Sequence, residues 1–369
     1  MSETYNRVYF VTGGGTGGHI YPALAVADAL NEDGAKVYYV GNKRNMEFSL
    51  ATKKGYKFLH VGVSGMPRKL NPKFFYWAIR LVRAILYSIR YIKKYKPDAV
   101  FATGGYVSAP MIFACRITKT PYMMHDCDAM PGLVTRRLCK RAKYVSLAFE
   151  RAKRYIPNKH SIITGNPIRG EFATLTKEEA RNNLGLGNRL TLTIMGGSQG
   201  AQSINNTACE VLKEFVQEKG MQVIFQTGKK NYDSILEKLR LIYPGFEQDG
   251  NLIIKPYFDD MISVLKSSDI VISRAGSLSL SEICASGAAP ILVPYPHAAA
   301  NHQRLNAKCL LDMGACIYIE DKDLEPNKLR ETILELLDNP VKMNYIKQNT
   351  SHLAKFDATE KIVECLKSL

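Results

Sequence analysis

The sequence of 369 residues contains no long hydrophobic run and no closely spaced pair of cysteines. No apolar stretch reaches the roughly 18 to 20 residues that a membrane-spanning helix needs, so we expect no transmembrane helix. No basic-then-apolar leader opens the chain, so we expect no secretion signal. The eight cysteines include no C-x-x-C pair and no metal-type spacing with histidine. They indicate reduced thiols in a cytosolic protein and no metal site.

Length and charge suggest two domains with different partners. A chain of this length can form two cores, and its 46% of apolar residues is typical of a soluble globular protein. Residues 1–166 carry 27 Lys and Arg against 9 Asp and Glu, whereas residues 167–369 carry 23 against 25. The first half is therefore expected to bind an anionic partner: nucleic acid, anionic lipid or a phosphorylated substrate. A solvated basic surface is the simpler alternative.

Short apolar strands alternate with amphipathic helices, which predicts parallel sheets covered by helices on both faces. Gly165-Asn166-Pro167 separates two series of strands, because the residue before proline is disfavoured in a helix. Each series opens with a strand that runs into a glycine turn, so we predict two related doubly wound units. The predicted strands lie at 7–12, 36–41, 58–61, 98–102, 121–124, 143–147 and 161–164, then at 190–195, 221–225, 252–254, 270–272 and 289–293.

The first glycine turn, residues 13–18, follows the apolar run Val8-Tyr9-Phe10-Val11 and ends on His19. Strand, glycine turn and helix form the arrangement that points backbone N–H groups at a phosphate. The turn satisfies G-x-G-x-x-G. However, the second strand runs into Gly41-Asn42 instead of a ribose-binding acid, which argues against a nicotinamide dehydrogenase. A helix N-terminus favours the neutral imidazole of His19, which either takes a proton from a hydroxyl or only hydrogen-bonds to the turn.

Two further glycine turns follow later strands. Residues 196–201 offer small side chains, exposed amides and a hydroxyl, and residues 103–106 are expected beside the first turn. Glycine turns suited to phosphate binding in successive units suggest a cleft that holds two phosphorylated ligands. Glu282 falls on a helix after a serine-rich turn, where its carboxylate either accepts ribose hydroxyls or complements the helix dipole. Gln303 and Asn306 are suited to sugar hydroxyls.

The segment from Gly65 to Pro97 contains nine Lys and Arg, no acidic residue and many aromatic and aliphatic side chains. Asn71-Pro72 predicts a helix start, because proline is favoured at the first helical position. A basic helix with this many apolar side chains is typical of one that lies on an anionic bilayer. The alternative is an ordinary surface helix whose apolar side faces the sheet.

Taken together, these motifs carry a family resemblance over essentially the whole chain. In sequence order they are Gly13–His19, Thr103–Tyr106, Gly165–Arg169, Gly196–Ala201, Phe258–Met261, Arg274–Glu282 and His302–Ala307. The chain closely resembles the MurG family, the undecaprenyl-diphospho-muramoylpentapeptide N-acetylglucosaminyltransferases of bacterial cell-wall synthesis. The resemblance implies a GT-B fold, with two Rossmann-like doubly wound domains facing across a cleft. It places an acceptor and membrane-binding domain at 1–166, a UDP-sugar domain at 167–349, and a last helix at about 350–369 that packs on the first domain.

The activity that the resemblance implies is inverting transfer of N-acetylglucosamine, without a cofactor or metal. The donor would be UDP-N-acetylglucosamine, and the acceptor would be the 4-hydroxyl of the muramoyl residue of undecaprenyl-diphosphate-MurNAc-pentapeptide. This step converts lipid I to lipid II in peptidoglycan synthesis. The protein would lie peripherally on the cytoplasmic face of the cell membrane. Its expected partners are an anionic membrane surface and the cell-wall synthesis machinery, without nucleic acid.

Residue roles carry over by position. His19 would be the general base, Phe258 would flank the uracil, and the turn Ser277–Ser281 would wrap the nucleotide. Glu282 would hold the ribose and Gln303 the sugar hydroxyls, while Ser198 and Arg169 would meet the diphosphate. The implied acceptor-side residues are Thr16, Gly17, Gly18, Gly104, Gly105 and Tyr106. The implied donor-side residues are Asp128, Arg169, Ser198, Gln199, Phe258, Ser277, Leu278, Ser279, Leu280, Ser281, Glu282 and Gln303.

One departure from the family pattern affects the expected donor site. The family usually reads His-Glu-Gln-Asn where this chain has His125-Asp126-Cys127-Asp128, and a later Asn is Thr135 here. An ionised Asp128 accepts hydrogen bonds but cannot donate them, so either the sugar hydroxyls donate or donor affinity and preference have shifted. The alternatives are another GT-B UDP-sugar glycolipid glycosyltransferase, a UDP-N-acetylglucosamine 2-epimerase-like isomerase, and a non-catalytic membrane-bound binding protein.

Overall fold

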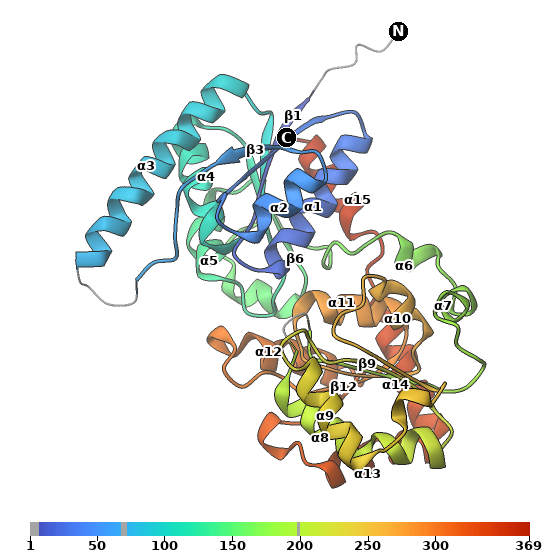
Figure 1. The fold of residues 1–369 in the computed structure, drawn as a ribbon. Coiled ribbons are helices and arrows are strands. Elements are labelled where there is room, and N and C mark those ends of the chain that lie inside the picture. Colours follow the sequence, from blue (N-terminus) through green and yellow to red (C-terminus); the bar gives the residue numbers. More distant parts are fainter. Residues whose placement is uncertain (1–6, 68–71, 198–199) are drawn as a thin grey trace. The chain divides into compact units, whose positions relative to one another are not determined.

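The computed structural model describes residues 7–67, 72–197 and 200–369. The chain divides into two compact units, one of residues up to Ile168 together with Asp357–Leu369, the other of Arg169–Phe356. The unit boundaries thus lie at 168/169 and 356/357, compared with the expected 166/167 and about 350. Each unit is built on one parallel sheet with helices on its faces (Figure 1).

The sheet of the first unit has the strand order β3-β2-β1-β4-β5-β6-β7, and all its neighbours are parallel. The order reverses between β1 and β4, and in such sheets ligands bind at the carboxyl ends of the strands beside that reversal. The glycine turns after β1 and β4 lie at those ends. The strands are β1 (Val8–Thr12), β2 (Lys36–Gly41), β3 (Lys57–His60), β4 (Ala99–Ala102), β5 (Tyr122–Asp126), β6 (Tyr144–Leu147) and β7 (Ser161–Ile163).

Alternate residues of these strands enter two cores, as the period of a strand requires. Phe10 packs with the core that includes Met111 of α4, whereas Tyr9 and Val11 pack with the core that includes Ile362 of α15. The C-terminal helix α15 also packs against α1 in this unit. The helices are α1 (Gly17–Glu32), α2 (Met46–Lys53), α3 (Pro72–Tyr95), α4 (Gly105–Thr118), α5 (Leu133–Leu138) and α15 (Ala358–Lys367).

The second unit repeats the plan, with the parallel order β10-β9-β8-β11-β12-β13. Its strands are β8 (Thr191–Met195), β9 (Gln222–Gln226), β10 (Leu252–Lys255), β11 (Ile270–Ser273), β12 (Ala289–Leu292) and β13 (Ile317–Tyr318). Its helices are α6 (Glu171–Thr174), α7 (Lys177–Leu184), α8 (Gln202–Lys213), α9 (Tyr232–Ile242), α10 (Met261–Ser267), α11 (Ser277–Ser286), α12 (His302–Leu311), α13 (Pro326–Asp338) and α14 (Pro340–His352).

The predicted fold class is confirmed, and each strand predicted from the sequence is present within one or two residues. Strand β13 was missed because two residues are too short for an apolar pattern to stand out. The helix predicted to start at Asn71-Pro72 is α3, whose first described residue is Pro72. Among the described residues, no helix combines the length and apolar character needed to cross a membrane.

Candidate functional site

The β1–α1 turn presents a helix N-terminus at the carboxyl edge of the first sheet. Thr16 is the N-cap residue, α1 begins at Gly17, and Gly15 and Thr16 are exposed. The first backbone N–H groups of a helix have no partner within the helix and lie at the positive end of its dipole. The turn therefore offers donors to an anion. Gly15 adopts φ +88°, a left-handed conformation that favours glycine.

The β1–α1 and β4–α4 turns pack directly against each other, as predicted. A Cβ atom on Gly13 would lie 1.9 Å from Thr103 Oγ1, and one on Gly105 would lie 2.5 Å from the carbonyl oxygen of Gly14. Thr103 Oγ1 donates a hydrogen bond of 2.5 Å to the carbonyl oxygen of His19. Only glycine permits this approach, so both turns form one rigid platform.

The imidazole of His19 lies against the backbone of the β4–α4 turn. A Cβ atom on Gly104 would lie 3.5 Å from His19 Cε1, and one on Gly105 would lie 3.1 Å from His19 Cδ2. His19 is half-buried on the first turn of α1. Backbone contacts on the ring restrict its rotamers, which is what a positioned proton acceptor needs.

The end of β5 places His125 in the interior of the first unit. Its ring nitrogens lie 2.7 Å from Ser146 Oγ and 3.1 Å from Asn166 Oδ1. Burial lowers the pKa of His125 to about 4, although the hydrogen bond with Asn166 partly opposes this. His125 is therefore neutral near pH 7. Its two partners connect β5 to β6 and to the segment after β7.

Asp126 organises the loop that carries Asp128. Its carboxylate accepts hydrogen bonds from the backbone N–H groups of Asp128 at 3.3 Å and Gly132 at 2.9 Å. Burial raises the pKa of Asp126 to about 7, and the charge of Asp128 raises it further. Ligand atoms of Asp126, Cys127 and Asp128 lie within 4.8 Å of one another. Because the Asp126 oxygens already brace the loop, we assign no metal to these consecutive residues.

In the second unit, the β8–α8 turn also requires glycine. A Cβ atom on Gly196 would lie 2.2 Å from the backbone nitrogen of Ala201, and one on Gly200 would lie 2.3 Å from the carbonyl oxygen of Thr227. Helix α8 begins immediately after, at Gln202. Ser198 and Gln199 lie outside the described residues, so their contacts with the diphosphate stay predictions.

The predicted nucleotide-wrapping turn Ser277–Ser281 is wrong as a turn. These residues form the first turns of α11, with Gly276 as the N-cap. The segment contains no glycine or proline after Gly276, and buried Ser277 and Leu280 face the interior, so a helix forms. What the site offers here is a second helix N-terminus, with Leu278 and Ser279 half-buried.

Arg169 and Glu282, predicted for the diphosphate and the ribose, form an ion pair in this structure. Arg169 Nη2 lies 3.3 Å from Glu282 Oε1, and the two side chains are 42% and 22% exposed. Burial raises the pKa of Glu282, and the charge of Arg169 partly opposes this. A ligand that uses both groups would exchange this pair for its own contacts.

Gln303 is oriented by the backbone. Its Oε1 accepts hydrogen bonds from the N–H groups of Ala275 at 3.3 Å and Tyr295 at 2.9 Å. The oxygen is thus engaged by the backbone, and the contact of Gln303 with a sugar hydroxyl stays a prediction. Asn306 is buried, and its Nδ2 donates to the carbonyl oxygen of Ala275 at 3.2 Å.

Phe258 is buried in the second unit. The ring of Phe258 is only 4% exposed and packs with Ile224 and Val264, while its N–H donates to Gln226 Oε1 at 3.0 Å. Its contact with uracil stays a prediction.

Sequence reasoning gave Arg274 no role, yet it donates to the Val293 carbonyl at 3.0 Å and pairs with Asp321 at 2.5 Å. An arginine directly after a buried strand was the available signal.

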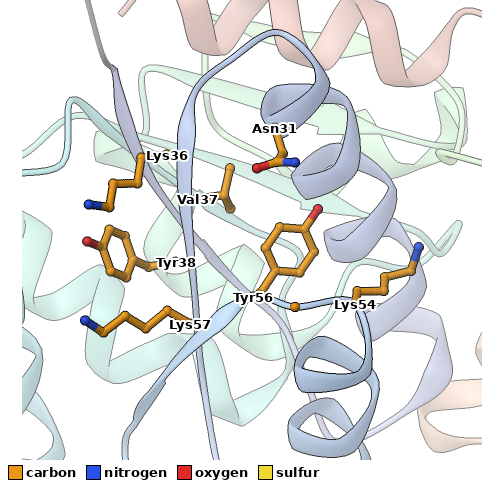
Figure 2. A pocket seen from close by; sticks show the side chains of 8 residues that line it. Asn31, Lys36, Val37, Tyr38, Lys54, Tyr56 and Lys57 are labelled. Atoms are coloured by element: carbon orange, nitrogen blue, oxygen red, sulfur yellow. The ribbon is translucent and has the colours of Figure 1, made fainter.

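Two cavities among the described residues lie away from the predicted site residues. One of about 400 Å³ opens at the amino ends of β2 and β3, at the sheet edge opposite the glycine turns (Figure 2). A second of about 720 Å³ surrounds Asp269, which precedes β11. The first is lined by Asn31, Lys36, Val37, Tyr38, Lys54, Gly55, Tyr56 and Lys57. Neither cavity includes a predicted site residue.

Comparison with known proteins identifies the family. The glycosyltransferase family 28 N-terminal domain matches residues 9–147, and its C-terminal domain matches residues 191–362. A UDP-N-acetylglucosamine–N-acetylmuramyl-(pentapeptide) pyrophosphoryl-undecaprenol N-acetylglucosamine transferase from Thermoanaerobacter sp. strain X514 is 38% identical over 98% of this chain and 99% of its own length. The chain belongs to this transferase family.

Two further comparisons agree with the family assignment. A protein of the same name from Desulforamulus reducens is 36% identical over 97% of this chain and 98% of its own length. The crystal structure of MurG from Acinetobacter baumannii superposes with a TM-score of 0.80 at 26% identity, covering 98% of this chain and all of that one. The family fold is GT-B, which agrees with the two parallel sheets described above.

Proposed function

We propose that this protein transfers N-acetylglucosamine from UDP-N-acetylglucosamine to lipid I, forming lipid II in peptidoglycan synthesis. The observation that carries the proposal is the 38% identity, over nearly the full length of both chains, with a transferase named for this reaction. The acceptor is undecaprenyl-diphosphate-MurNAc-pentapeptide, and the attacking group is its muramoyl 4-hydroxyl.

His19 supplies the base in this mechanism. The acceptor hydroxyl attacks the anomeric carbon, the bond from that carbon to the UDP oxygen breaks, and its electron pair leaves with UDP. The hydroxyl proton passes to the imidazole, which the helix N-terminus keeps neutral and the Gly104-Gly105 backbone holds in place. One direct displacement inverts the anomeric configuration.

The amides of the first unit bind the acceptor diphosphate in this proposal. Thr16, Gly17 and Gly18 supply N–H donors at the start of α1, and the ring of Tyr106 lies beside Gly15, 3.2 Å from where a Cβ atom would be. In the second unit, Glu282 accepts the ribose hydroxyls and Gln303 Nε2 donates to the sugar. Asp128 accepts from the sugar hydroxyls.

Helix α3 binds an anionic membrane surface in this proposal. Phe75, Ile79, Val82 and Leu86 are each more than half exposed and follow one another at helical spacing along one stripe. The opposite side of α3 packs on the core through Ala84, Ser88 and Ile92. The inner side of α3 packs as an ordinary surface helix would, and the outer stripe, exposed among the described residues, supports the membrane interpretation. The exposed arginines Arg83 and Arg90 suit anionic headgroups.

The test is release of UDP from UDP-N-acetylglucosamine with and without a polyprenyl-diphosphate-linked muramoyl pentapeptide. We expect UDP to be released only when this acceptor is present, and the product to carry a β-linked sugar. Conversion of the donor to an epimerised sugar nucleotide without any acceptor, and with no net release of UDP, would support the 2-epimerase alternative. Donor binding without release for this acceptor, but with release for another glycolipid, would assign a different glycosyltransferase.

A further inference from the structure

A buried carboxylate lies directly behind the first glycine turn. Glu47 is fully buried although it is the second residue of α2, where an acidic side chain usually extends into solvent to complement the helix dipole. Instead it turns inward, and a Cβ atom on Gly14 would lie 2.6 Å from its carboxyl carbon. The side chain thus fills the space behind the turn.

Three hydrogen bonds connect this carboxylate to the turn and to its neighbours. Glu47 Oε2 accepts from the N–H of Gly15 at 3.3 Å. Glu47 Oε1 accepts from the N–H of Asn42 at 3.2 Å and from Asn45 Nδ2 at 3.0 Å. A buried carboxylate needs such donors, so the contacts fix its position as well as that of the turn.

The same hydrogen-bond network reaches the β4–α4 turn. Asn45 Nδ2 also donates to the hydroxyl of Tyr106 at 3.0 Å. The ring of Tyr106 lies beside Gly15, with Cε1 3.2 Å from the position a Cβ atom would take. Glu47, Asn45 and Tyr106 therefore enclose Gly15 from behind and from one side.

We infer that Glu47 is a positioning residue for the acceptor diphosphate: it engages the Gly15 N–H and so leaves the backbone amides of Thr16, Gly17 and Gly18 at the start of α1 as the donors to the anion. The inference rests on the proposed function and deepens it. An N–H that points at Glu47 cannot also point at a phosphate, so the anion-binding donors begin one residue later. Asn45 extends the same restraint to Tyr106.

Glu47→Gln is the sharpest probe because it changes chemistry and not volume. Three donors face the two oxygens of Glu47, and glutamine replaces one oxygen by a donor. At least one of the three donors then faces the new NH₂ group. The arrangement with only one donor–donor clash keeps the amide oxygen towards Asn42 and Asn45 and places the NH₂ against the N–H of Gly15. The matched control is Asp28→Asn, since Asp28 also accepts from two side chains, Lys54 at 2.7 Å and Tyr56 at 2.5 Å, on α1 away from the turn.

The experiment measures kcat and acceptor KM by UDP release, the Kd for UDP, and amide hydrogen exchange of the peptide that contains Gly15. For Glu47→Gln we expect kcat/KM for the acceptor to fall by about 10- to 100-fold, unchanged UDP affinity, and faster exchange in the turn. Asp28→Asn should retain all of these values. Unchanged kcat/KM and exchange in a folded Glu47→Gln would overturn the inference, as would an equal loss of UDP affinity.

If Glu47→Gln does not fold, Asn45→Ala is the second variant. It removes one of the three donors to Glu47 and the connection to Tyr106, but leaves the bond from Gly15 N–H to Glu47, so it should lower kcat/KM in the same direction by a smaller factor. A folded Asn45→Ala with wild-type kinetics and exchange would then count against the inference. If the wild-type protein releases no UDP with the acceptor, the proposed function fails, and hydrogen exchange alone still shows whether Glu47 holds the turn.

Discussion

His125 and Asp126 are consecutive buried residues of β5 whose pKa values move in opposite directions, to about 4 for the imidazole and about 7 for the carboxyl. Burial is the main cause for both, because it disfavours whichever form carries charge. Between pH 4 and 7 both side chains are therefore neutral. The interior of the first unit avoids two buried charges next to the proposed catalytic turn.

This relationship predicts opposing effects on stability. The folded state holds the Asp126 proton up to about pH 7. The contribution of Asp126 to folding stability is therefore complete below pH 4 and declines as the pH rises to 7. The His125 contribution is complete above pH 6.5 and is lost as the pH falls to 4. Between pH 4 and 6.5, we expect the urea midpoint of Asp126→Asn to rise more steeply with increasing pH than that of wild type. Over the same range, the urea midpoint of His125→Gln should fall with increasing pH. Parallel pH profiles for wild type and both variants would contradict the assignment.

His19→Ala should lower kcat by about 10²- to 10⁴-fold, because the acceptor hydroxyl loses its base. UDP affinity should stay within about twofold, since the roles proposed for the nucleotide lie in the second unit. Transferase kinetics and calorimetric titration with UDP measure the two quantities. His160→Ala is the control, an exposed histidine in the turn immediately before β7. A near-normal turnover of His19→Ala would remove His19 as the base.

The Arg169–Glu282 pair predicts how donor binding depends on pH. Glu282 must be ionised to accept two ribose hydroxyls, so affinity for UDP should fall as the pH decreases through its raised pKa. Arg169→Ala removes a cation that favours the ionised form, so the midpoint of that fall should move to higher pH. Titrations with UDP from pH 4.5 to 8 test this, with Glu282→Gln as the variant that loses the dependence. A midpoint that stays or decreases in Arg169→Ala would exclude the coupling.

The membrane role of α3 makes a quantitative prediction. Replacing its cations by Gln should weaken binding to vesicles that contain anionic lipid by about 1 kcal/mol for each residue near the surface, and less at high salt. The variant changes Arg80, Arg83, Arg90 and Lys93. Its control carries the same charge change at exposed lysines of the second unit, Lys213, Lys219, Lys328 and Lys355. Equal vesicle binding by wild type and the α3 variant in sedimentation assays would rule out this surface.

Asp269 should be the most sensitive carboxylate of the second unit. Its side chain is 5% exposed and pairs with Lys177, Arg181 at 3.1 Å and Lys347 at 2.9 Å. Burial alone would raise its pKa, but Lys177 and Lys347 outweigh it, so the pKa is lowered and the stabilisation is lost as the pH falls below about 4. We expect Asp269→Asn to cost about 3–5 kcal/mol of unfolding free energy at pH 7. Glu335→Gln, which breaks the exposed pair with Lys342, should cost less than about 1 kcal/mol.

The sequence predicted the strands and the glycine turns well because those features are local. A buried parallel strand is a short apolar run, and a turn that opens a helix needs glycine where φ is positive. The segment Ser277–Ser281 was misread for the same local reason. Serines favour turns in isolation, whereas the packing of Leu280 into the interior favours a helix.

The sequence by itself determined two doubly wound units, the glycine turn that ends on His19, and the basic character of the first half. Only the tertiary structure decided that Thr103 bonds to the His19 carbonyl, that Glu47 holds Gly15, and that Gln303 Oε1 accepts from two backbone N–H groups. These contacts join residues far apart in the chain. Apolar periodicity reports which side of a strand or helix is buried, but the partner of a buried polar group is fixed only when the strands take their order in the sheet.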